Sequence, residues 1–189
     1  ISGNIYKGRV VNVLDGMQAA FVAFGQEKNG YLYAGDIPAE ADIPPADRTL
    51  NVKPGDEVMV QVAKSPIGTK GARLSMCLSF VGKNLIYLPT SDFCAVSRKI
   101  TDAEQREQLL RTAEKLRAEG GGFVMRTNAA HANLPELRVE AKYLRGLYEA
   151  ALEAYENASV GDIVHHDADV QVRLLRDFDL ADIDHIYIG

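Results

Sequence analysis

One hairpin in the sequence carries the side chains that single-stranded nucleic acid needs. In residues 17–33, MQAAFVAFGQEKNGYLY, alternation places Phe24 on one face of a strand and Phe21 on the other. Two glycines bracket a turn that returns Tyr31 beside Phe21, with Lys28 in the turn. Flat rings stack on unpaired bases, and cations neutralise the phosphates between them. The hairpin therefore predicts an RNA-binding surface.

The distribution of charge supports a local basic patch rather than bulk electrostatic capture. The net charge is −5, but residues 1–100 hold 11 Lys and Arg against 9 Asp and Glu, whereas residues 101–189 hold 10 against 17. A patch in the first segment predicts modest, strongly salt-dependent RNA affinity. Its expected members are Lys7, Arg9, Lys64 and Lys70.

A second candidate site lies where Arg126 and Thr127 follow the apolar run at 123–125. An Arg guanidinium grips a terminal phosphate with two N–H groups, and a neighbouring hydroxyl and backbone amides complete such a cradle. The same Arg also suits a structural role, paired with a helix carboxylate at a strand end. The residues alone leave both interpretations open.

The elements that position the first site are short strands with Gly-rich turns. Segments 3–13, 53–63 and 68–75 read as strands or turn-strand units beside the hairpin, so residues 1–79 predict a five-stranded OB-type β-barrel. Residues 38–51 are Pro-rich and predict a surface loop inserted into it.

Residues 80–189 predict a small α/β domain, which makes the expected fold class α+β. Thr101 and Glu104 suggest a capping box that opens a helix, and glycines at 120–122 end it. Pro135 marks the start of a second helix, which runs to about Asn157. Strands are expected at 85–88 and 123–125, a third helical run at 170–178 and a final strand at 185–188.

These motifs resemble the bacterial ribonuclease E/G family of endoribonucleases. GNIYKGRV, AAFVAFG, GYL, KPGDEVMVQV and TKGARLS are similar to its S-one-type RNA-binding OB domain. GKNLIYLP, VSRKI, GGFVMRT and residues 177–188 are similar to the 5′-sensor region that follows it. The resemblance covers essentially the whole chain and implies that the parent protein processes or degrades single-stranded RNA.

The resemblance also implies roles for individual residues. Tyr31 stands where the family often has Phe, and stacking on a base accepts either ring. Ile86 stands where Val is common in the family. The implied RNA contacts are Phe21, Tyr31, Lys64, Lys70 and, as a further phosphate or RNA contact, Arg98. The implied pocket for a 5′-monophosphate consists of Gly82, Ile86, Arg126 and Thr127.

We expect no catalytic residue, metal ligand or cofactor in this chain. The family's Mg²⁺-binding aspartates and its Cys-Pro-x-Cys zinc link belong to later segments, so Mg²⁺ and a linking Zn²⁺ are implied only for the full-length parent, as is oligomerisation. The fragment alone is expected to be inactive. The side chains of adjacent residues diverge, and His131 and His185 are distant in sequence. We therefore expect no metal site at His165, His166 and Asp167. We expect the carboxylates of four aspartates to lie in solvated helix ends and turns rather than in a metal site: Asp177, Asp179, Asp182 and Asp184.

Composition indicates a cytoplasmic protein. Cys77 and Cys94 are isolated thiols, which suits a reducing compartment. No signal-peptide pattern and no apolar run of about 18 residues is present, so neither secretion nor a membrane partner is expected. Two other functions stay open: a non-catalytic OB-fold RNA-binding module, such as a translation or RNA-chaperone factor, and a cytoplasmic filament-associated structural protein.

Overall fold

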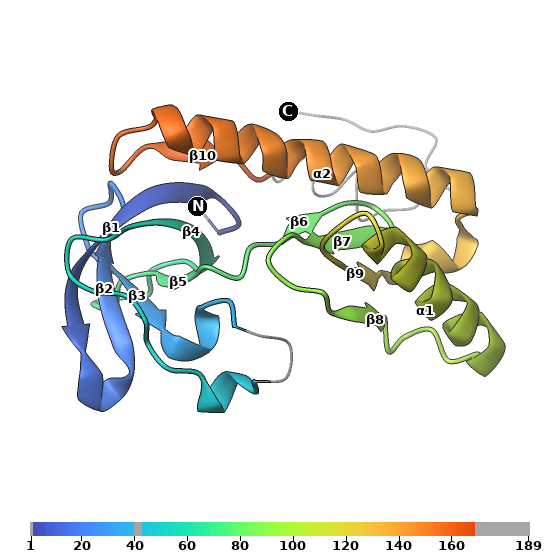
Figure 1. The fold of residues 1–189 in the computed structure, drawn as a ribbon, viewed down its shortest axis with the longest axis horizontal. Helices are drawn as coiled ribbons and strands as arrows, with labels where there is room; N and C mark the ends of the chain where they lie inside the picture. Colours follow the sequence, from blue (N-terminus) through green and yellow to red (C-terminus); the bar gives the residue numbers. More distant parts are fainter. Residues whose placement is uncertain (1, 40–42, 169–189) are drawn as a thin grey trace.

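The chain forms a β-barrel and a smaller α/β layer that lie side by side, with one long helix running along both (Figure 1). The computed structural model describes residues 2–39 and 43–168. The fold is α+β with an OB-like barrel, as the sequence predicts. The helical run expected at 170–178, the strand at 185–188 and the four tail aspartates lie outside the described residues.

Five strands close the barrel in the order β1-β2-β3-β5-β4, because β4 also pairs with β1. All pairs are antiparallel except β3 with β5. Alternate residues face inward and form the first core, as expected for half-buried strands. The strands are β1 (Ile5–Leu14), β2 (Ala19–Ala23), β3 (Gly30–Tyr33), β4 (Glu57–Lys64) and β5 (Arg73–Ser75). The core includes Val10, Val22, Phe24, Leu32, Val60 and Leu74.

The barrel gains one strand from the far end of the chain. β10 (Ile163–His165) pairs antiparallel with β1, and no strand was predicted at these residues. Gly161 (φ 101°) leads into β10 and packs against Gly25 (φ 80°), where an added Cβ would collide with the Gly161 backbone. Both glycines are therefore required by conformation and by this close approach.

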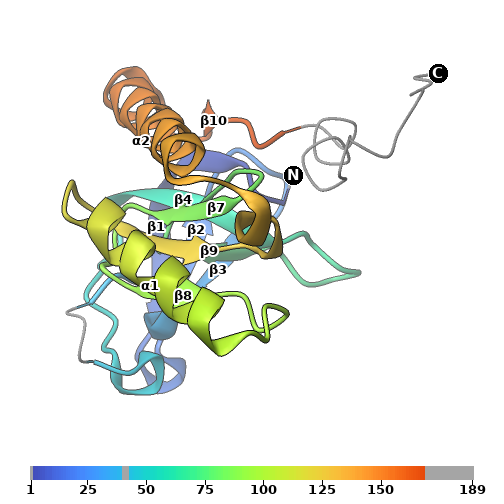
Figure 2. The same ribbon diagram turned by 90° about the vertical axis from the view of Figure 1, so that its right-hand side faces the viewer.

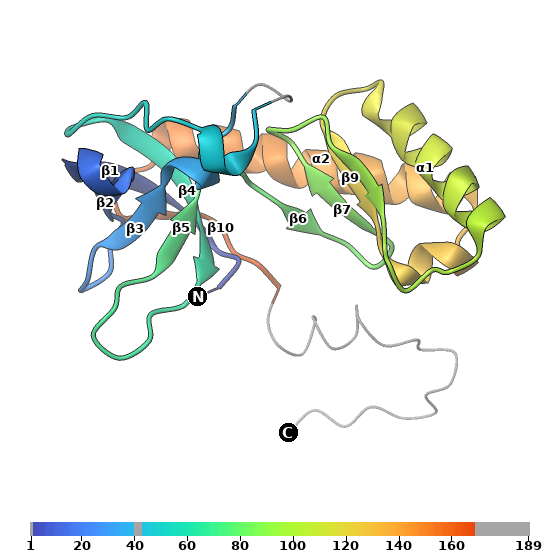
Figure 3. The same cartoon turned by 90° about the horizontal axis from the view of Figure 1, so that it is seen from below.

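The α/β layer is a four-stranded sheet with both long helices on one face (Figures 2 and 3). Its order is β6-β7-β9-β8, with β8 and β9 parallel. The strands are β6 (Phe80–Val81), β7 (Leu85–Leu88), β8 (Cys94–Val96) and β9 (Gly122–Met125), and the helices are α1 (Ala103–Arg117) and α2 (Leu134–Asn157). Leu85, Tyr87, Phe123 and Met125 are buried against the helices. Ile86 and Val124 pair on the opposite, half-buried face.

The helices begin at side-chain caps, one of which lies a residue later than expected. Asp102, not Thr101, caps α1 by accepting the Gln105 N–H at 2.8 Å. Asp is as strong an N-cap as Thr, and this register moves Glu104 out of the capping-box position. At α2, Asn133 and Glu136 form a complete capping box around Pro135. No described helix is long and apolar enough to span a membrane.

The long helix is attached to the barrel by a buried lysine. Lys7 is only 9% exposed, and its Nζ donates to the Tyr155 carbonyl at 3.2 Å while lying 3.1 Å from the Glu57 carboxylate. Arg9 contacts the same carboxylate at 2.6 Å, and the hydrogen bonds from Arg9 and Lys7 lower the pKa of Glu57. Of the two cations expected in a basic RNA patch, Lys7 is therefore buried beneath α2, whereas Arg9 pairs with Glu57 and stays exposed.

His165 gives the fold a predicted dependence on pH. Its ring packs edge-on against Phe80 with centroids 4.9 Å apart, and burial lowers its pKa, partly opposed by Asp167. The unfolded chain therefore binds more protons as pH falls through about 6.5. The stability contributed by neutral His165 is present above that pH and is lost as pH falls through the lowered folded pKa.

We expect His165→Phe, which keeps a ring but cannot titrate, to flatten the fall in thermal midpoint between about pH 7.5 and pH 5. Thermal melts at a series of pH values measure this effect. Exposed His131, which lies in the short 3-10 helix after β9, supplies the control, since His131→Gln should leave the profile parallel to wild type. Parallel profiles for wild type and His165→Phe would show that His165 does not carry the pH dependence.

Candidate RNA interface and phosphate pocket

Four strands align two aromatic and two basic side chains in a row across the outer face of the barrel. Phe21 on β2 pairs with Tyr31 on β3, Tyr31 pairs with Arg73 on β5, and Arg73 pairs with Lys64 on β4. The centroids of the Phe21 and Tyr31 rings lie 4.9 Å apart, and the angle between the ring planes is 54°. Because residues in register share a face, bases on the rings would lead their phosphates toward the cations. We refer to these four residues as the barrel row.

The loop that carries Lys70 is held beside the barrel row. Lys28 Nζ donates to the Gly68 carbonyl at 3.1 Å, which joins the hairpin turn to this loop. Gly71 lies so close to Asn29 that an added Cβ would collide with the Asn29 carbonyl, and it would also contact the Tyr31 ring at 3.4 Å. Lys70 itself is exposed. The loop therefore presents a further cation next to the rings.

Arg73 is the member of the row that sequence reasoning missed. Its guanidinium forms two hydrogen bonds with the Asp36 carboxylate, at 3.0 and 3.1 Å, and lies 5.6 Å from the centre of the Tyr33 ring. Alternation with the buried Ala72 and Leu74 marks Arg73 as outward-facing, and that was the available signal. Asp36 holds the guanidinium in place but also offsets part of its charge.

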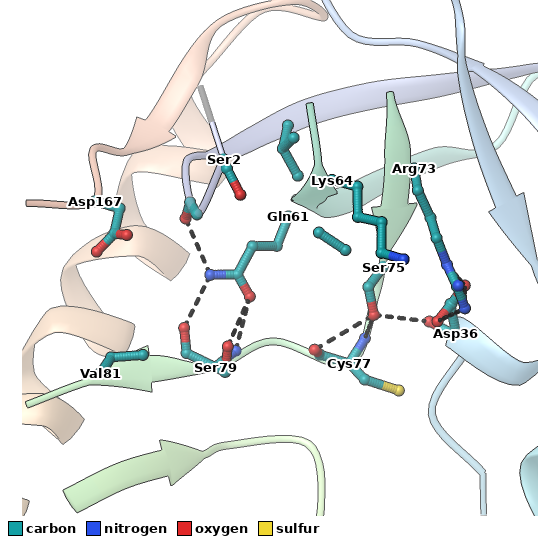
Figure 4. A pocket seen from close by; sticks show the side chains of 13 residues that line it. Ser2, Asp36, Gln61, Lys64, Arg73, Ser75, Cys77, Ser79, Val81 and Asp167 are labelled. Atoms are coloured by element: carbon teal, nitrogen blue, oxygen red, sulfur yellow. Dashed lines mark hydrogen bonds and ion pairs between the residues drawn. The ribbon is translucent and has the colours of Figure 1, made fainter. Parts of the chain in front are cut away.

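A pocket of about 440 Å³ opens at the Lys64 end of the barrel row (Figure 4). Its floor is organised by the buried Gln61 side chain, which donates to the Gly3 and Ser79 carbonyls at 3.0 and 2.9 Å and accepts from the Ser79 N–H at 2.8 Å. Burial raises the pKa of the Cys77 thiol at the rim. The hydrogen bonds of Gln61 join the residues before β1 to the segment that leads into the second sheet.

The second candidate site is a pocket of about 580 Å³ at one end of the four-stranded sheet. Ile86, Arg126 and Thr127, three of the four predicted residues, line it. The Ser97 and Thr127 hydroxyls lie 3.0 Å apart, so both point into the same region. The other polar lining residues are Lys99 and Asn128. This pocket thus gathers a guanidinium, an ammonium and two hydroxyls.

Gly82 and Arg98, the remaining predicted residues of this region, lie outside the pocket lining. Gly82 is joined to it through Arg126, whose Nη1 donates to the Gly82 carbonyl at 2.6 Å. Arg98 is exposed in the turn after β8, and its neighbour Lys99 lines the pocket instead. Lys99 lies in the same VSRKI motif and was not among the predicted contacts.

Comparison with known proteins identifies the family of the chain. The model of the ribonuclease E/G family matches residues 79–189. Ribonuclease G of Haemophilus influenzae is 35% identical over the whole chain, and ribonuclease G of Escherichia coli K12 is 34% identical. The chain belongs to the ribonuclease E/G family. Ribonuclease E of H. influenzae is 32% identical over 98% of the chain.

The chain spans 40% of the length of these two ribonuclease G proteins and 20% of that ribonuclease E. Within the described part of the chain, no three His, Cys, Asp or Glu side chains are placed to hold a metal ion. The described residues do place two aromatic rings and two cations in a row on the barrel, and they place a guanidinium, an ammonium and two hydroxyls in one pocket.

Proposed function

We propose that this chain recognises RNA for an endoribonuclease of the ribonuclease E/G type. The barrel row and Lys70 hold unpaired nucleotides, while the pocket at Arg126 and Thr127 binds a 5′-monophosphate end. Cleavage is the work of other parts of the parent protein, which use Mg²⁺. The proposed setting is the cytoplasm, and the proposed partner is single-stranded RNA with a 5′-monophosphate.

The observation that carries this proposal is the convergence of donors on one pocket. Arg126, Lys99 and the paired Ser97 and Thr127 hydroxyls come from two neighbouring parallel strands and the turns that follow them. A terminal phosphate has oxygens for a guanidinium, an ammonium and hydroxyls at once, and charge-assisted hydrogen bonds of this kind are the strong ones. Ile86 and Val124 form an apolar wall beside them, against which a ribose or base can rest.

The barrel row supports the RNA part of the proposal through its order. The rings lie on two adjacent β-strands and the cations on the next two. RNA whose bases stack on Phe21 and Tyr31 therefore reaches Arg73 and Lys64 along the same outer face of the barrel. Stacking tolerates any base, because every base has a π-face. The proposed RNA contacts are therefore tolerant of sequence, and selectivity comes from the 5′ end.

The chain alone is predicted to bind RNA and not to cut it. We expect anisotropy of a labelled single-stranded oligoribonucleotide to report tighter binding when its 5′ end is a monophosphate than when it is a hydroxyl or a triphosphate. The same RNA incubated with the chain and Mg²⁺ should remain intact on a denaturing gel. Equal affinity for the three ends would contradict end sensing. Cleavage that disappears with Asp177→Asn or Asp179→Asn would place catalytic carboxylates in this chain.

A further inference from the structure

One carboxylate reaches from the long helix into the turn beside Arg126. Glu140 on α2 accepts the Asn84 N–H at 2.9 Å and the Leu85 N–H at 3.2 Å through Oε1, and the Asn84 side-chain amide at 2.8 Å through Oε2. Its side chain is half-buried. Three donors on one carboxylate, two of them backbone groups, fix the conformation of the turn at residues 82–85.

Gly82 is the point at which this turn meets the phosphate pocket. A Cβ added at Gly82 would collide with the Glu140 carboxylate, so any other residue would force that carboxylate to shift. The Gly82 N–H donates to the Leu85 carbonyl at 2.8 Å, and the Gly82 carbonyl accepts from Arg126 Nη1 at 2.6 Å. The backbone N–H of Arg126 donates to the Asn84 carbonyl at 2.8 Å. Glu140 thus holds one side of a turn whose other side holds Arg126.

We propose that Glu140 is a positioning residue for recognition of the 5′-monophosphate. By fixing the turn it fixes the Gly82 carbonyl, and that carbonyl holds one end of the Arg126 guanidinium at the wall of the pocket. A long arginine side chain loses rotamer entropy when it is immobilised on a ligand, and an anchor present before binding removes that cost. The inference rests on the proposed function of the pocket and deepens it.

The test is Glu140→Gln in the 189-residue chain, with RNA of one sequence carrying either a 5′-monophosphate or a 5′-hydroxyl. Glutamine keeps the size of the side chain, but its NH₂ group cannot accept a hydrogen bond, so part of the anchor is lost. We expect the ratio of the two affinities to fall on the order of tenfold, as for supporting groups that orient a binding residue. Binding of the 5′-hydroxyl RNA should stay unchanged, because the barrel row is intact.

Matched variants separate positioning from general destabilisation. Glu153→Gln, at an exposed position on the same helix, should leave both affinities unchanged. Asn84→Ala removes the donor to Oε2 alone and should lower the ratio by a smaller factor. The Nε–H signal of Arg126 in a ¹⁵N correlation spectrum should shift in Glu140→Gln and stay in place in Glu153→Gln, since only the first change disturbs the turn.

The outcomes distinguish this inference from the proposed function. Suppose that wild type prefers the 5′-monophosphate and that folded Glu140→Gln keeps this preference in full, with an unmoved Arg126 signal. That result overturns the positioning role of Glu140 and leaves 5′-end sensing intact. A wild-type chain with no preference overturns both. If Glu140→Gln does not fold, Asn84→Ala decides: an unchanged ratio in that folded variant overturns the proposal, and a reduced ratio supports it.

Discussion

Replacing Arg126 with alanine should remove most of the preference for 5′-monophosphorylated RNA while leaving the weaker affinity of the barrel row. The guanidinium lines the pocket next to the Thr127 hydroxyl and is held by the Gly82 carbonyl. A hydrogen bond to a charged partner contributes about 1.5 to 3 kcal/mol, and a bidentate contact contributes two of them. We therefore expect a loss of tenfold or more in monophosphate affinity and almost none for the 5′-hydroxyl RNA.

The expected result depends on how each 5′ end fills the pocket. A monophosphate satisfies the donors, a hydroxyl leaves them without a charged partner, and a triphosphate adds charge and bulk beyond the two hydroxyls. Anisotropy with the three RNAs measures the difference, and the parent enzyme allows the same comparison by rates of cleavage. Arg111→Ala serves as the control, because Arg111 is exposed on α1 and pairs only with Glu107 among the described contacts.

Two results would contradict the assignment of Arg126. Full retention of the preference in folded Arg126→Ala would make this residue a structural group at a strand end. A loss shared equally by the three RNAs would show that Arg126 supports RNA binding in general rather than the 5′ end. The first result would leave Lys99 as the cation of the pocket, and the second would move end recognition elsewhere.

The sequence predicted those parts of the site that depend on local periodicity. Alternation is enough to place Phe21 outward and Phe24 inward, and both placements are confirmed by burial of Phe24 and partial exposure of Phe21. A buried strand ending at Arg126 is likewise a local pattern, confirmed by β9. The barrel followed from strand length and glycine-rich turns, since such strands must close to protect their edges.

The parts that were missed depend on contacts between distant segments. Arg73 joins the barrel row through a parallel pairing with β3 and a bulge in β4 between Val62 and Lys64, and neither is encoded in a local pattern. Lys7 looks like a surface cation on its strand, yet it is buried by the end of a helix that lies 148 residues later. Glu140 reads as part of a solvated helix face, although it contacts a turn 56 residues away.

Replacing Phe21 or Tyr31 with alanine should weaken binding of single-stranded RNA by about 1 to 3 kcal/mol per lost stack. Each ring is half-buried and the two lie 4.9 Å apart, so one ring supports the other as well as a base. The double variant should therefore lose a different amount from the sum of the single losses, as expected for residues in contact. Fluorescence anisotropy gives the affinities, and thermal melts show whether each variant is folded.

The control for stacking is an exposed ring outside the barrel. Tyr143 lies on α2 with 63% of its surface exposed, so Tyr143→Ala removes an aromatic side chain without touching the barrel row. We expect its RNA affinity to match wild type. Unchanged affinity in folded Phe21→Ala and Tyr31→Ala would assign both rings to packing of the barrel surface. The cations Lys64, Lys70 and Arg73 would then have to account for RNA binding, and the affinity would fall with salt as steeply in the variants as in wild type.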